Sequence, residues 1–304
     1  MMLLHKSRLL IPSIRIAAVL LLPISFVLAL ARPSESQEAA SQASVAEEGR
    51  ARQANAWNED GMRLFASGKY SGAAQAFEKV YSLYPENTDV AFNYGLALQA
   101  LGQFERAIVP LLKVAAARPK DAEALLTLGV CYFGVGRLDE GVKLLQKALE
   151  GEPTNVRTLF YLAVAYHRLK RDEEANERLR WMAERNPDSP VTYLYIARAL
   201  RIAMKYDEAE KVIKKVLALD LQLADAHFER GLIERGLKHP GEAEKSFREA
   251  LRLRPEVPDV HVALGEIYLR DRGDPEGAIP YFQRAIELNT RTIPSPTSTS
   301  GTRY

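Results

Sequence analysis

The 304-residue sequence predicts an all-α fold, an α-solenoid made of stacked antiparallel helical hairpins. Two ladders of residues indicate it, because both recur every 34 residues and keep step with each other over most of the chain. One ladder consists of prolines, and the other consists of small residues. The prolines are Pro85, Pro119, Pro153, Pro187 and Pro255, and the small residues are Ala73, Ala107, Gly141, Ala175, Ala209 and Ala243.

A third ladder of small residues lies on the expected first helix of each hairpin. Counted from the start of a unit, it occupies position 8, and bulky residues stand at positions 7 and 11 in most copies. Positions 4, 7, 8 and 11 share one face of an α-helix, so the small residue lets a neighbouring helix approach closely. A second helical face follows at positions 20, 24 and 27. The ladder is Gly61, Gly95, Gly129, Ala163, Ala197, Gly231 and Gly265.

Turn and capping residues separate the helices. Gly68, Gly102 and Gly136 stand between the two helices of the first three units, where a left-handed residue ends a helix. The next three units carry Lys170, Met204 and Lys238 instead, so we expect a different turn geometry there. Asn87, Asp121, Asn155 and Ser189 stand where the next first helix needs a cap. The seven units are 54–87, 88–121, 122–155, 156–189, 190–223, 224–257 and 258–292.

The order of these positions resembles the tetratricopeptide repeat. Each unit has a small residue at positions 8 and 20, most units have a bulky residue at 11 and a proline at 32, and the first unit adds Trp57 at position 4. The seven units, 54–292, cover about four fifths of the chain. The resemblance implies a right-handed superhelix whose first helices line a concave groove, and a role in binding a protein or peptide partner.

In the family, groove positions include 5, 9 and 12. Mapped onto this sequence, they predict a groove that changes from apolar to partly basic, suited to a segment with apolar anchors followed by acidic residues. The alternative is that the apolar residues pack between adjacent first helices and the arginines are solvated. The predicted groove residues are Phe92, Leu96, Leu126, Val130, Phe133, Phe160, Val164, Leu194, Arg198, Arg201, Phe228, Leu232 and Arg235.

Some family members grip a C-terminal carboxylate with a set of Lys and Asn residues. This sequence does not match that set, because Met62, Glu123 and Thr127 occupy neighbouring places.

The sequence carries no pattern of catalytic or metal-binding residues. It has no phosphate-binding Gly loop, nucleophile elbow or HExxH motif. His227 and His261 share one position in successive units, but further converging ligands are missing, so we expect ordinary packing. Cys131 is the single cysteine, and we expect it to be a buried small residue. We therefore expect no enzyme activity, no cofactor and no metal.

The first 31 residues have the order of a secretory signal. Basic residues up to Arg15 precede the apolar run 16–31, which ends in the cleavage candidate Ala29-Leu30-Ala31. An uncleaved anchor is the alternative, in which case the protein is a structural subunit of a membrane or polysaccharide export assembly. Both interpretations place the rest of the chain outside the cytoplasm, periplasmic or secreted, and limit membrane contact to this segment.

Charge and composition describe the remaining segments. Beyond residue 31 the chain carries 38 basic and 39 acidic residues, so no basic excess favours a nucleic-acid partner. Residues 32–53 form a polar tether whose last part extends the first helix backwards. The tail 293–304 is rich in Ser, Thr and Pro, and we expect it to be disordered. The last helix lacks a polar capping helix, which predicts cover by a partner or self-association through the last repeat.

Overall fold

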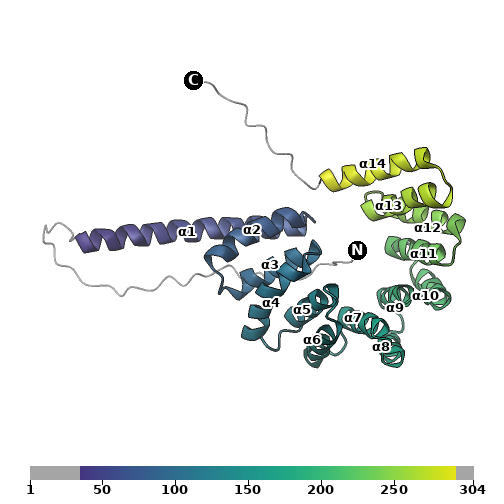
Figure 1. The fold of residues 1–304 in the computed structure, drawn as a ribbon, viewed down its shortest axis with the longest axis horizontal. Helices are drawn as coiled ribbons and strands as arrows, with labels where there is room; N and C mark the ends of the chain where they lie inside the picture. The colour runs from purple at the N-terminus through teal and green to yellow at the C-terminus, as the bar shows by residue number, and fades with distance from the viewer. Residues whose placement is uncertain (1–34, 292–304) are drawn as a thin grey trace, which may run out of the picture. The chain divides into compact units, whose positions relative to one another are not determined.

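The computed structural model describes residues 35–291, and its helices confirm the predicted all-α fold. Fourteen α-helices and one short π-helix make up the described part, which contains no strand (Figure 1). The predicted signal segment 1–31 and the tail 293–304 lie outside the described residues. Within residues 35–291, none of the helices combines the length and the apolar composition that a membrane span requires.

The helices follow one another as seven hairpins. From the second hairpin on, each first helix begins at the residue with which the 34-residue period starts a unit. The hairpins are α1 (Glu35–Ala66) with α2 (Tyr70–Leu83), α3 (Thr88–Ala100) with α4 (Phe104–Ala117), α5 (Ala122–Gly134) with α6 (Leu138–Gly151), α7 (Val156–Arg168) with α8 (Asp172–Arg185), α9 (Pro190–Ile202) with α10 (Tyr206–Leu219), α11 (Ala224–Gly236) with α12 (Pro240–Leu253), and α13 (Pro258–Glu266), continued by η1 (Ile267–Asp271), with α14 (Pro275–Arg291).

Helix α1 begins much earlier than the sequence predicts. The polar segment expected to be a tether is helical from Glu35, and its side chains at 43–50 are exposed. Ala, Glu, Gln and Arg are strong helix formers, and Arg52 pairs with Glu48 one turn away at 3.3 Å. A helix already anchored by packing needs no new nucleus to extend. This polar segment therefore forms a helix although its side chains at 43–50 bury no core.

The chain forms two compact units, which divide between Ala117 and Arg118. In the N-terminal unit, α2 packs on both α1 and α3, and α3 packs on α4. In the C-terminal unit, α7 contacts both α5 and α9, and α9 contacts α11. The second helices α6, α8, α10 and α12 each contact the next first helix as well as their own. The first helices therefore form an inner row and the second helices an outer row of this unit (Figure 1).

The small residue at position 8 lets the two helices of one hairpin approach closely. A Cβ atom built on Gly95 would lie 2.6 Å from Cγ of Leu111, and one on Gly231 would lie 2.4 Å from Cε1 of Phe247. The partner in each case is the residue at position 24 of the same unit. Units four and five have alanine at position 8, and position 24 is then Leu179 or Ile213, never phenylalanine.

The expectation of a different turn in units four to six is wrong. Lys170, Met204 and Lys238 have φ values of 61°, 59° and 63°, close to the 71° of Gly102. The hydrogen bonds agree as well, since the next residue's N–H donates to the carbonyl five residues earlier at 2.9 Å after Gly102 and at 2.8 Å after Lys170. This double-bonded helix end imposes the left-handed conformation on whichever residue stands there.

Candidate interaction surface

Most of the predicted apolar groove residues are buried. They are at most 7% exposed, so they stabilise the helix packing and offer a partner little surface. Only three apolar members of the predicted set, Phe133, Phe228 and Leu232, are half-buried. The buried members are Phe92 and Leu96 in the N-terminal unit and Leu126, Val130, Phe160, Val164 and Leu194 in the C-terminal unit.

The predicted basic part of the groove is paired internally. Arg198 donates from Nε to Glu229 at 3.0 Å, and Arg201 pairs with the same carboxylate, which is 1% exposed. Arg235 donates to Glu266 at 2.7 Å. Each of these arginines therefore pairs with a carboxylate of the chain itself and is not fully solvated. Mapping positions 5, 9 and 12 missed this pairing because Glu229 stands at position 6.

Ion pairs of this kind connect most neighbouring first helices of the inner row. Glu123 on α5 accepts from Arg157 on α7 at 3.1 Å, and the pairs just described connect α9 to α11 and α11 to α13. Between α7 and α9 the contact is aromatic instead. The Phe160 ring lies 5.0 Å from the ring of Tyr161 and 5.2 Å from that of Tyr195, centroid to centroid. At the α7–α9 interface, aromatic contacts thus replace the ion pairs found between the other first helices of the inner row.

Four hydrogen-bond donors surround this aromatic contact, and we call Arg157, Tyr161, Tyr195 and Arg198 the donor cluster. Burial raises the pKa of both tyrosine hydroxyls, while the charges of Arg157 and Arg198 act to lower it. Each hydroxyl therefore lies within electrostatic range of both guanidinium groups. Within residues 35–291, neither hydroxyl has a hydrogen-bond partner, and neither oxygen is among the fully buried atoms that lack one, so both keep contact with solvent.

A further aromatic and a further cation extend the cluster. The Phe133 ring lies 6.2 Å from that of Tyr161, and the Arg168 guanidinium stacks 4.8 Å above Phe133. No carboxylate of the described residues pairs with Arg168. The sequence contains a signal for these residues, because Arg157 and Tyr161 are one helical turn apart, but they and Arg168 stand at positions 2, 6 and 13, outside the predicted groove positions 5, 9 and 12.

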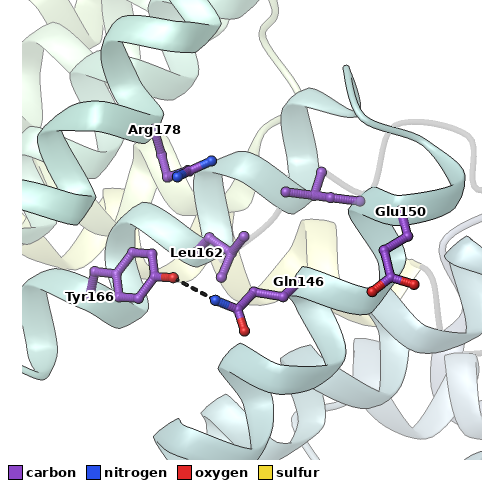
Figure 2. A pocket seen from close by; sticks show the side chains of 6 residues that line it. Gln146, Glu150, Leu162, Tyr166 and Arg178 are labelled. Carbon is purple, nitrogen blue, oxygen red and sulfur yellow. Dashed lines mark hydrogen bonds between the residues drawn. The ribbon is translucent and has the colours of Figure 1, made fainter.

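A small depression lies between α6, α7 and α8, with a volume of about 270 Å³ (Figure 2). In it, Gln146 donates to the Tyr166 hydroxyl at 2.9 Å (Figure 2). Arg178 pairs with Glu177 at 3.0 Å, while its Nε has no partner. The depression thus offers one unpaired N–H group, fewer than the donor cluster. Its lining residues are Gln146, Leu149, Glu150, Leu162, Tyr166 and Arg178.

The remaining candidate residues have structural roles. His227 bonds the Leu221 carbonyl through Nε2 at 2.8 Å, and His261 bonds the Pro255 carbonyl in the same way at 3.1 Å. Both therefore fix the turn that precedes their helix. Cys131 is buried, and the described part of the chain contains no group of three or more His, Cys, Asp or Glu side chains that could hold a metal.

Solved structures with a similar fold are tetratricopeptide repeat proteins or share their helical architecture. A tetratricopeptide repeat protein from Parabacteroides merdae is 16% identical with a TM-score of 0.56, and the match covers 78% of this chain and 93% of that one. Yeast Tom70 is 17% identical with a TM-score of 0.61, covering 83% of this chain and 54% of that one. The human IFIT1 dimer with m7Gppp-AAAA is 20% identical with a TM-score of 0.54, covering 78% and 61%. At these identities the likeness shows the fold alone.

Sequence comparison identifies the family. No curated protein matches the sequence. Two tetratricopeptide repeat models match it, one at residues 64–124 and 133–191 and the other at residues 95–156 and 228–291. Together they cover more than half of the chain. The chain therefore belongs to the tetratricopeptide repeat family.

Proposed function

We propose that this protein is a non-enzymatic scaffold outside the cytoplasm, and that the inner row of its C-terminal unit binds a segment of a partner protein. Tetratricopeptide repeats indicate a protein–protein interaction scaffold, which is the general part of the proposal. A broad helical surface suits an extended segment or a helix of a partner better than a small molecule.

The donor cluster carries the specific part of the proposal. Ion pairs elsewhere along the inner row satisfy the charged groups of neighbouring helices. Between α7 and α9, two tyrosine hydroxyls and parts of two guanidinium groups remain without acceptors among the described residues. Hydrogen bonds from charged donors to an anion are stronger than neutral ones, so a ligand that supplies an anionic acceptor is stabilised there.

The structure changes which apolar residues serve as contacts. The sequence predicts Phe160 as a groove residue, but that side chain is 6% exposed and holds the aromatic contact together. Phe133, Phe228 and Leu232 keep exposed surface on the same row. The proposed partner segment therefore contacts these three side chains and places its polar groups at the donor cluster.

Charge reversal on the two rows tests the proposal. Arg168→Glu changes the inner row at a residue that pairs with no carboxylate of the described part, and Lys143→Glu changes an exposed residue of the outer row. Partners captured from cell envelope extract are identified by mass spectrometry and then purified for titration. We expect Arg168→Glu to weaken binding about tenfold or more, and Lys143→Glu to leave it within about twofold. Equal affinities for both variants would reject the inner row as the binding surface.

The proposed location outside the cytoplasm relies on the N-terminal segment. Lys6, Arg8 and Arg15 followed by the apolar run 16–31 support export. Mass spectrometry of the chain made in a secreting host measures its N-terminus. A chain that begins at Arg32 supports cleavage, whereas one that keeps Met1 favours the anchored alternative.

Self-association through the last repeat is a separate proposal. Ile279 and Ile286 on α14 are 51% and 62% exposed, as expected for a terminal repeat that no further helix covers. Light scattering at high concentration tests it. A dimer that Ile286→Glu converts to a monomer supports it, and a strictly monomeric protein contradicts it.

A further inference from the structure

We propose that the donor cluster binds the carboxylate side chain of a single Asp or Glu in the partner segment. This inference rests on the proposed function and adds the chemical identity of the group that the inner row recognises.

The geometry of two neighbouring helices brings the four donors together. Arg157 and Tyr161 stand one turn apart on α7, and Tyr195 and Arg198 stand one turn apart on α9. The two helices contact each other, and the ring of Phe160 lies against both tyrosine rings. Two phenol groups and two guanidinium groups therefore face one region of the inner row.

The hydrogen-bond inventory of this region has an excess of donors. A guanidinium group carries five N–H donors. Arg157 gives Nη1 to Glu123, and Arg198 gives Nε to Glu229, so both keep further N–H groups. Adding the two hydroxyls leaves more donors than acceptors, because only the two phenol oxygens can accept. A carboxylate offers about four lone-pair sites and no donor, which is the complement of this set.

Charge selects the same ligand. Arg157, Arg198 and Arg201 pair with only two carboxylates, Glu123 and Glu229, so these five groups carry one positive charge in excess. The side chains of Arg157 and Arg198 are only 22% and 16% exposed, so solvent screens an ion pair with them weakly. Burial raises the pKa of Tyr161 and Tyr195 from its ordinary value, a shift that favours the protonated hydroxyls, which can donate.

This site differs from the terminal-carboxylate clamp that the sequence fails to match. Its donors are tyrosine hydroxyls and guanidinium groups between two neighbouring repeats, and no Lys or Asn contributes. Nothing in it requires a chain terminus, so an internal acidic residue fits.

The double variant Tyr161→Phe/Tyr195→Phe tests the site with little change of shape, because each substitution removes one hydroxyl oxygen. The probes are short fluorescent peptides with amidated C-termini, randomised at apolar positions around one central Glu, and a matched library with Gln. We expect the wild type to bind Glu peptides about tenfold more tightly than Gln peptides. In the double variant, the affinity for Glu peptides should fall to that for Gln peptides.

Stability separates a binding role from a structural one. If the hydroxyls wait for a ligand, removing them should leave the melting temperature unchanged, because neither makes a hydrogen bond within the described residues that the substitution would break. Tyr193→Phe is the control in the same helix, since its hydroxyl bonds Lys215 at 2.6 Å. We expect this control to lower stability slightly and to leave the affinity for Glu peptides unchanged. A drop in melting temperature for the double variant would overturn the assignment.

The peptide results also distinguish failure of the carboxylate site from failure of the proposed inner-row interaction surface. Peptides that bind the wild type regardless of Glu or Gln overturn the carboxylate site while the interaction surface stands. If no peptide binds and Arg168→Glu leaves capture of the purified partner unchanged, the interaction surface fails as well. Displacement of bound Glu peptide by millimolar phosphate but not by acetate, at equal ionic strength, would assign the site to phosphate and overturn the proposal.

Discussion

Replacing Gly231 with alanine tests how closely the two helices of a hairpin approach. The added Cβ would lie 2.4 Å from Cε1, 2.5 Å from Cδ1 and 2.9 Å from Cζ of Phe247. Carbon atoms in contact are normally about 3.5 Å or more apart, so the ring must retreat by about 1 Å. Phe247 is fully buried in a cluster with Val260, Leu264 and Ile267, so the ring can retreat only against other core side chains.

The effect of Gly231→Ala on the free energy of unfolding combines two opposing contributions. Overpacking a well-packed core costs about 1–3 kcal/mol, and a contact this short belongs at the upper end of that range. Alanine is favoured over glycine inside a helix by about 1 kcal/mol. Gly231→Ala should therefore destabilise the protein by about 1–2 kcal/mol. Gly241→Ala is the matched control, because its Cβ would meet nothing within 4 Å, and it should stabilise by up to about 1 kcal/mol.

Urea unfolding followed by circular dichroism measures both variants and a rescue. Phe247→Leu gives unit six the alanine–leucine combination that unit four has in Ala163 and Leu179. The double variant Gly231→Ala/Phe247→Leu should be more stable than the sum of the single effects predicts, by about 1 kcal/mol or more. An unfolding midpoint for Gly231→Ala at or above that of the wild type, or strictly additive effects, would refute the close-approach argument.

Two further substitution pairs test the turns and the ion pairs of the described chain. Gly102→Ala should destabilise the protein by about 1 kcal/mol from left-handed strain alone, because the added Cβ meets no atom within 4 Å. Met204→Gly should stabilise the protein by about 0.5 kcal/mol, because the exposed Met204 already bears that strain. Thermal unfolding of both variants checks that the two effects have opposite signs. Glu229→Gln should destabilise the protein by about 3 kcal/mol, because it leaves two half-buried arginines without their carboxylate. Glu266→Gln should cost less than about 1 kcal/mol, because the Glu266 side chain is 32% exposed. Denaturant titration measures both losses of stability, and equal losses would contradict the burial argument.

The fold was largely predictable because its signal repeats. Each small residue at position 8 and each proline at 32 is weak alone, but seven units in phase locate a helix start such as Ala122 or Val156 to the residue. The left-handed turn at Lys170 was not predictable from residue type, because the hydrogen bonds of the helix end outweigh the local preference for glycine. The early start of α1 follows from the helix propensity of Ala, Glu, Gln and Arg, which favours a helix even where no core is buried.

The candidate surface was less predictable, because exposure depends on side-chain packing between repeats. Phe160 stands at a groove position of the family and is nevertheless covered by the tyrosine rings. Arg198 is an unpaired cation in the sequence, and its partner Glu229 comes from the next first helix, 31 residues away. The 34-residue period locates each position on its helix. The residues on the two neighbouring first helices decide whether a side chain is left unpaired and exposed.

Photo-crosslinking tests most directly whether the inner row of residues 118–291 binds the partner. A photoreactive phenylalanine analogue replaces Phe133 or Phe228 on the inner row and, in separate variants, the exposed Lys143 or Lys211 on the outer row. Irradiation with the purified partner should give covalent adducts from positions 133 and 228 and none from positions 143 and 211. Adducts from the outer row alone, or equal yields from both rows, would contradict the assignment of the inner row as the binding surface.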